Sequence, residues 1–136
     1  MYLETLDNFA AVAERKAAMI RSHPLPFFVS AMMAGAYVGL GIILIFSVGA
    51  TLDPAWRRLV MGASFGIALT LVIFAGSELF TGHTMFMTIG RLRQRISGSD
   101  LAASWTLSWL GNLAGAVLLV LVLIPGIGRE VNGARR

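Results

Sequence analysis

The sequence predicts an all-α integral membrane protein with three transmembrane helices, the second of which is interrupted by a loop. Hydrophobic residues make up 57% of the 136 positions and charged residues only 13%, whereas a soluble domain carries about 25% charged residues. The charges are concentrated outside three apolar blocks, and each block is long enough to cross a hydrocarbon core of ~30 Å. The length allows a single domain. Membrane-flanking cations explain the net charge of +4, and nucleic acid is not an expected partner.

The residues before the first apolar block have the pattern of an amphipathic helix. We expect this helix at residues 2–21, lying along the membrane surface. Its apolar side chains recur at helical spacing, opposite acidic and basic ones: Leu3, Leu6, Ala10, Ala13, Ala17 and Ile20. The acids in this segment are untypical of a signal peptide. Pro24 and Pro26 are expected to end the helix, because proline removes a backbone donor.

The three apolar blocks give the predicted spans. The first span is expected at residues 27–50 and, after a turn at Asp53-Pro54, the second at residues 59–90. The third span is expected at residues 101–124, with Ser99 or Asp100 as its N-cap. We predict that residues 125–136 form a polar, disordered tail.

The second block contains polar residues where a lipid-spanning helix normally has Leu or Val. They lie in the stretch GSELFTGHTMF, which begins at Gly76. An ionisable side chain such as Glu78 costs ~2.5 kcal/mol or more at mid-membrane. We therefore predict a loop at residues 76–83, bracketed by Gly76 and Gly82, with the second half-helix resuming near Thr84. Such a break exposes backbone N–H groups that favour an anion; a kink without a ligand is the alternative.

Three side chains are expected to support this loop. Glu78 is predicted to satisfy loop N–H groups or a neighbouring helix rather than to transfer a proton. His83 lies five residues after Glu78, whereas two ligands on one helix face are three or four apart, so no metal site is expected. Asn112 is predicted to hydrogen-bond across to the interrupted helix. The sequence has no cysteine, and no nucleophile–base pair or cofactor motif indicates an enzyme.

Each apolar block also contains a pair of glycines four residues apart. Such pairs lie on one helix face and allow two backbones to approach closely. We expect a tightly packed bundle in which these glycines line the helix contacts: Gly35 and Gly39, Gly62 and Gly66, Gly111 and Gly115.

Three stretches of the sequence resemble the first half of the formate/nitrite transporter family, closest to its nitrite-channel branch. They are AGAYVGLGIILIF, VMGASFGIALTLVIFAGSELFTGHTMF and WLGNLAG, and the similarity extends over residues 11–121. The resemblance implies one inverted repeat of an aquaporin-like fold, pentameric assembly, and passage of a small monovalent anion, nitrite or formate, across the bacterial cell inner membrane.

The resemblance also implies roles for individual residues. Leu79 and Phe80 would narrow the cytoplasmic side of the pore, and Thr81 would face its central chamber. Phe65 would lie at the outer constriction and Leu69 at the inner one. Phe65 and Leu69 are four residues apart and therefore share a helix face, and rings of apolar side chains can gate a pore by dewetting.

The family's second repeat, with its pore histidine and its substrate-attracting lysine, is not matched. We expect this chain to be a shortened part of a channel, which needs a second half to form a pore. A half-size transporter is an alternative, since the cations divide nearly evenly between the two sides of the membrane and would permit two opposite orientations. A non-transporting subunit that packs with a full-length channel is another.

Overall fold

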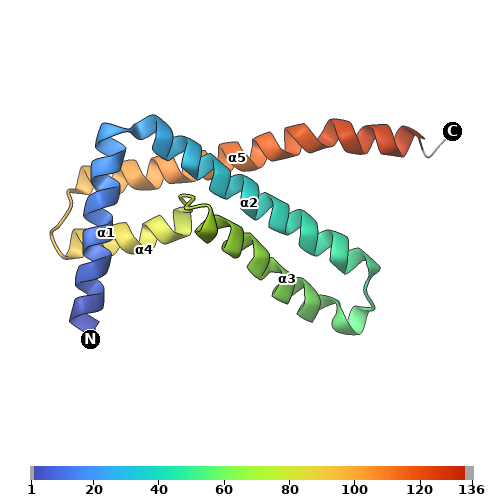
Figure 1. The fold of residues 1–136 in the computed structure, drawn as a ribbon, viewed down its shortest axis with the longest axis horizontal. Coiled ribbons are helices and arrows are strands. Elements are labelled where there is room, and N and C mark those ends of the chain that lie inside the picture. The colour runs from blue at the N-terminus through green and yellow to red at the C-terminus, as the bar shows by residue number, and fades with distance from the viewer. Residues whose placement is uncertain (1, 134–136) are drawn as a thin grey trace.

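The computed structural model describes residues 2–133, including the side chains of residues 2–124, and this part of the chain forms five helices without a strand (Figure 1). Their bounds are α1 Tyr2–Ser22, α2 Pro24–Thr51, α3 Pro54–Phe74, α4 Phe80–Leu92 and α5 Gly98–Gly133. Three stretches are long and apolar enough to cross a membrane: Pro24–Thr51, Pro54–Phe74 and Gly98–Ile124. The predicted all-helical membrane fold is therefore confirmed.

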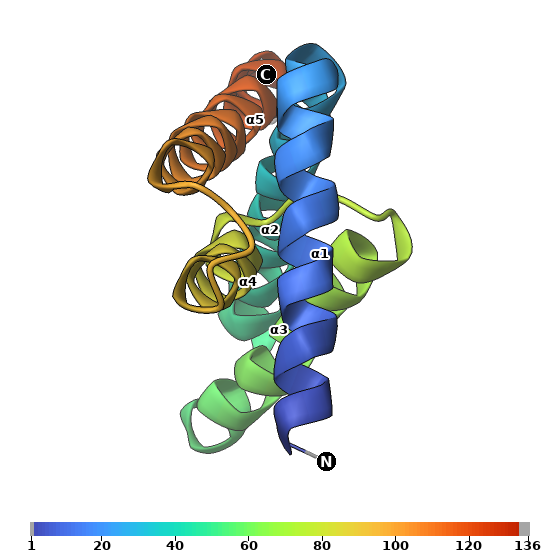
Figure 2. The ribbon, with the colours of Figure 1, turned by 90° about the vertical axis from the view of Figure 1, so that its left-hand side faces the viewer.

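The most extensive helix contact is that of α2 with α5, which cross each other at an angle (Figure 1). α2 also packs against α3, to which it is joined as an antiparallel hairpin, while α4 packs against α1 and α5. α3 and α4 follow one another with a loop between them, α3 beside α2 and α4 beside the first part of α5 (Figure 1). Figure 2 shows α1 running crosswise to the other helices at one end of the bundle. This orientation suits a helix that lies along a membrane surface while α2 and α5 cross the bilayer.

Prolines start two of the helices earlier than predicted. α2 begins at Pro24 rather than at residue 27, and α3 begins at Pro54 rather than at residue 59. Proline is tolerated in the first helical turn, where its missing N–H would have no intrahelical partner. At α3 the Asp53 carboxylate also accepts a hydrogen bond from the Ala55 N–H at 2.9 Å, which caps the helix.

The third span also differs from prediction at both ends. Its cap is Ser97 rather than Ser99 or Asp100: the Ser97 hydroxyl accepts from the Asp100 N–H at 3.1 Å, and the Asp100 carboxylate accepts from the Ser97 N–H at 3.0 Å. This reciprocal pair is a capping box with Asp in the usual Glu position. The helix then continues through Pro125 to Gly133, so the predicted disordered tail is wrong over residues 125–133. Proline is tolerated inside membrane helices more often than in soluble ones, because other groups can satisfy the backbone carbonyl that it frees.

α1 is attached through small side chains and ion pairs. Its buried face consists of Ala10, Ala13, Ala17 and Ile20, while Leu3 and Leu6 at the predicted apolar face are exposed. The small face allows close contact with α4, since a Cβ added to Gly90 would lie 2.4 Å from the Ala13 Cβ. Ion pairs to the α4–α5 connection and to α5 flank this contact: Asp7–Arg93, Glu14–Arg95 and Arg21–Asp100.

Two backbones approach each other very closely where α2 crosses α5. A Cβ on Gly35 would lie 1.9 Å from the Asn112 carbonyl oxygen, and one on Gly115 would lie 1.8 Å from the Met32 carbonyl oxygen. Gly111 and Gly39 lie at the same contact, with corresponding distances of 2.5 Å to the Ala31 Cβ and 2.7 Å to the Leu119 Cδ2. Only glycine allows this separation at Gly35 and Gly115, because the opposing atoms are backbone.

The glycine pair in α3 has a different environment. No described residue outside the local helix backbone lies within 4 Å of a Cβ built on Gly62 or Gly66. In the described part of the chain, no other helix therefore packs against these two glycines as predicted. The contact of α2 with α3 is made instead by Gly41, where a Cβ would lie 2.4 Å from the Ala68 Cβ.

We predict that Gly35→Ala and Gly115→Ala each lower the free energy of unfolding in detergent by about 1–3 kcal/mol, the usual effect of overpacking. Either methyl group would force α2 and α5 apart. Gly62→Ala and Gly66→Ala are matched controls and should leave stability unchanged or raise it, since alanine is the better helix former. Equal loss of stability in all four variants would contradict the assigned contacts.

Candidate functional site

The break in the second span forms at a sharp turn after α3. Gly76 adopts a φ of +62°, a left-handed conformation that is readily available to glycine. The Gly76 N–H donates to the Ile73 carbonyl at 3.1 Å and the Ser77 N–H to the Val72 carbonyl at 3.0 Å. These bonds satisfy the carbonyls that α3 leaves free at its end, so the helix can stop inside an apolar span.

The loop is shorter than predicted. It covers residues 75–79, and α4 resumes at Phe80 rather than near Thr84, so Thr81, Gly82 and His83 are helical. The physical reason is a cap supplied from another helix: the Phe80 N–H donates to the Asn112 Oδ1 at 3.0 Å. With this donor satisfied, a helix can begin without a side-chain cap of its own.

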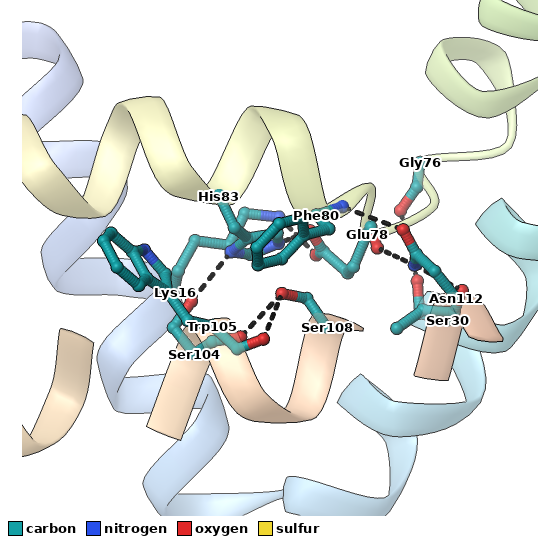
Figure 3. Close-up of polar contacts among 11 residues, drawn as sticks. Lys16, Ser30, Gly76, Glu78, Phe80, His83, Ser104, Trp105, Ser108 and Asn112 are labelled. Carbon is teal, nitrogen blue, oxygen red and sulfur yellow. Dashed lines mark hydrogen bonds and ion pairs between the residues drawn. The ribbon is translucent and has the colours of Figure 1, made fainter. Parts of the chain in front are cut away.

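Asn112 bonds to three segments at once. Besides accepting from Phe80, its side-chain nitrogen donates to the Glu78 carbonyl at 3.0 Å and to the Ala31 carbonyl in α2 at 2.8 Å. Figure 3 shows this side chain directed at the loop from α5. α2 adds two contacts, since the Glu78 N–H donates to the Ser30 carbonyl and the Ser30 hydroxyl to the Gly76 carbonyl. The cross-helix hydrogen bond predicted for Asn112 is present, and it joins the loop to α2 and α5.

A chain of polar side chains runs beside the loop (Figure 3). One Glu78 carboxylate oxygen pairs with the Lys16 ammonium of α1, and the other lies 2.8 Å from the His83 Nε2. The His83 Nδ1 lies 3.0 Å from the Ser104 hydroxyl of α5. Glu78, His83 and Ser104 are all buried. The carboxylate is therefore compensated by a cation and a hydrogen bond, as a buried charge requires.

A pocket of ≈ 340 Å³ borders this loop. α3, the loop, α4 and α1 contribute its lining: Leu69, Val72, Ile73, Gly76, Ser77, Glu78, Leu79, Thr81, Gly82, His83, Phe86 and Lys16. Leu69 is 44% exposed, and Thr81 is also exposed. Ile73, which also lines the pocket, is 74% exposed, so the described residues do not fully enclose the pocket.

The predicted pore residues divide among different surroundings. Leu69, Leu79 and Thr81 line the pocket together. Phe80 instead lines a separate pocket of ≈ 310 Å³ with Trp105, Thr106, Trp109 and Leu110. Phe65 is half-buried one turn before Leu69 and does not line the pocket at the loop.

Sequence reasoning missed Lys16 and Ser104. Lys16 was interpreted as a membrane-flanking cation, although it lies three residues after Ala13 and one before Ala17 on the helix face that becomes buried. Ser104 and Ser108 are four residues apart on α5, and both are fully buried. Their i, i+4 spacing with Asn112 places all three on one face of the third span, a pattern that could have identified the side facing the loop.

Comparison with known proteins identifies the family. A model described as the formate/nitrite transporter family matches residues 3–133. The chain belongs to this family. The nitrite transporters NirC of Salmonella typhimurium and of Escherichia coli are each 56% identical to it over 128 residues, which cover 94% of this chain and 48% of theirs. The formate channel FocA of Escherichia coli is 31% identical over 115 residues, covering 82% of this chain and 40% of its own.

A solved structure agrees with this assignment. An FNT family ion channel superposes with a TM-score of 0.87 at 56% identity, covering 93% of this chain and 51% of that chain. The chain thus spans about half the length of the curated relatives it matches. With its three apolar spans it is a multi-pass membrane protein, and the relatives named above are transporters or channels rather than enzymes.

We predict that Asn112→Ala lowers the free energy of unfolding by about 1–3 kcal/mol, the range for leaving a buried donor unsatisfied. It should also expose the loop, because the Phe80 N–H and the Glu78 backbone carbonyl both lose their bond to Asn112. Asn8→Ala, an exposed asparagine on α1, is the control and should change neither property. Thermal unfolding with limited proteolysis measures both, and an Asn112→Ala protein that matches the control would contradict the assigned role.

Proposed function

We propose that this chain forms one half of a channel that passes a small monovalent anion, nitrite in the first place, across the bacterial cell inner membrane. The observation that carries the proposal is the pocket at the broken span, in a chain that is 56% identical to two nitrite transporters. A second set of helices would cover the exposed lining residues, among them Leu69 and Thr81, and would complete the pore. Three apolar helices favour the inner membrane, because proteins that span the outer membrane are β-barrels.

The chemistry of the pocket suits an anion. Thr81 and Gly82 occupy the first turn of α4 and line the pocket, and the positive end of a helix dipole favours negative charge. The Thr81 and Ser77 hydroxyls add hydrogen-bond donors. Leu69, Leu79 and Phe86 are apolar walls that would hinder hydrated ions. Phe65 and Leu69 are the proposed outer and inner constrictions.

Assembly completes the proposal. We infer that the chain works with a second repeat and self-associates, as the family resemblance implies. The α2–α5 face carries an apolar groove of ≈ 410 Å³ that includes Met33, Ala36 and Leu118, which agrees with further helix contacts in the membrane.

The test is nitrite efflux from liposomes that hold the purified chain alone, the C-terminal half of the Salmonella relative alone, or both halves together. Efflux from the paired halves only is the expected result. Efflux from the chain alone would show that two copies complete the pore. Leakage equal to that of protein-free liposomes in all three samples would contradict the proposed function.

Within the paired sample we predict that Thr81→Ala slows nitrite efflux by about two- to tenfold, the equivalent of one lost hydrogen bond. Thr70→Ala is the matched control, since Thr70 is exposed on α3 and bonds only to the Gly66 carbonyl of its own helix among the described contacts. Equal rates of nitrite efflux from the two variants would contradict a role for Thr81 in the proposed path.

A further inference from the structure

His83 is a buried histidine in the lining of the pocket, and the proposed anion path assigns it no role. Its side chain is only 3% exposed in the first turns of α4. Glu78 lies on one side of the ring and Ser104 on the other, with Nε2 2.8 Å from the carboxylate and Nδ1 3.0 Å from the hydroxyl. The edge of the ring also contacts Phe27 of α2, with 5.1 Å between the ring centroids. The ring therefore contacts the loop, α2 and α5.

The partners determine how this imidazole hydrogen-bonds. An ionised carboxylate only accepts hydrogen bonds, so the Nε2 atom of His83 must donate to Glu78. In the neutral ring the Nδ1 atom is then an acceptor, and the Ser104 hydroxyl is placed to donate to it. This arrangement satisfies both ring nitrogens without adding a second buried charge.

Glu78 is the point where two opposing contacts meet. One carboxylate oxygen faces Lys16 from α1, whose side chain is 28% exposed, and the other faces the buried His83. A long, partly exposed lysine is a weak restraint, because it keeps much of its side-chain freedom. The histidine is hydrogen-bonded through both ring nitrogens and is therefore the rigid partner of the carboxylate.

We propose that His83, kept in its Nε2–H tautomer by Ser104, is the positioning residue that holds the Glu78 carboxylate and, through it, the loop between α3 and α4. Glu78 is followed directly by Leu79, Phe80 and Thr81, so its position sets the register in which these side chains reach the proposed anion path. The inference deepens the proposed function by assigning a residue that orders the loop.

Two conservative variants separate the contacts. His83→Gln places its amide N–H near the position of Nε2 and can keep the bond to Glu78, whereas His83→Asn places its amide near Nδ1 and can reach only Ser104. The chain has no cysteine, so Ser77→Cys supplies a single reporter within the loop. Its rate of modification by a methanethiosulfonate reagent, with the chain in lipid nanodiscs, measures loop opening.

We expect His83→Asn and His83→Ala to raise the modification rate about tenfold, the effect of losing a hydrogen bond to a charged group, and His83→Gln to stay within about twofold of the parent. A slow rate in His83→Asn, or a rate in His83→Gln as fast as in His83→Ala, would overturn the proposal.

Nitrogen NMR of labelled histidine gives a second readout that needs no change at position 83. The sequence contains two histidines, so His23→Gln leaves His83 as the single signal. The Nε2–H tautomer at neutral pH is the expected result, and an Nδ1–H tautomer or a doubly protonated ring overturns the proposal. Neither readout involves nitrite, so their outcome is distinguishable from a failure of the proposed channel function.

Discussion

A helix that breaks inside a membrane must find partners for the backbone groups that the break releases, since lipid offers none. In this chain one amide side chain supplies two of those partners: Asn112 bonds to the Phe80 N–H and to the Glu78 carbonyl, and it also donates to the Ala31 carbonyl of α2. Asn112 can reach all three only because α2 and α5 nearly touch at Gly35 and Gly115. The loop beside the proposed anion path thus depends on glycine, which has no side chain, at positions 35 and 115 of the helix contact.

The loop is restrained from a second direction by charge. The Glu78 carboxylate lies between Lys16 and His83, and His83 bonds to Ser104, so α1, the loop and α5 are connected through one polar chain. Interactions of this kind are expensive to leave unmade in a low-dielectric interior. Backbone capping by Asn112 and side-chain bonding at Glu78 therefore act on adjacent residues. Together they specify where the second half-helix begins and which side chains of its first turn face the pocket.

Much of this arrangement could be predicted from the sequence, because burying polar groups in a membrane permits few solutions. Apolar length indicated three spans, and Glu78 among glycines indicated the break. What the sequence did not reveal depended on partners distant along the chain. The early start of α4 at Phe80 requires the Asn112 cap, and the role of Lys16 requires α1 to fold back over the loop. The glycine spacing was the same in all three spans, yet Gly62 and Gly66 face no described neighbour outside their own helix.

By positioning Asn112, the α2–α5 contact holds the start of α4 in place, in addition to the turn at Gly76 and the contacts of Glu78. Hydrogen exchange at the Phe80 amide tests it most directly, measured in lipid nanodiscs for the parent chain and for Gly35→Ala. Gly35 makes no part of the loop, but its added methyl would displace the backbone of Asn112. We expect at least tenfold faster exchange at Phe80 in the variant, equivalent to about 1.4 kcal/mol of lost protection. Unchanged protection at Phe80 would contradict it.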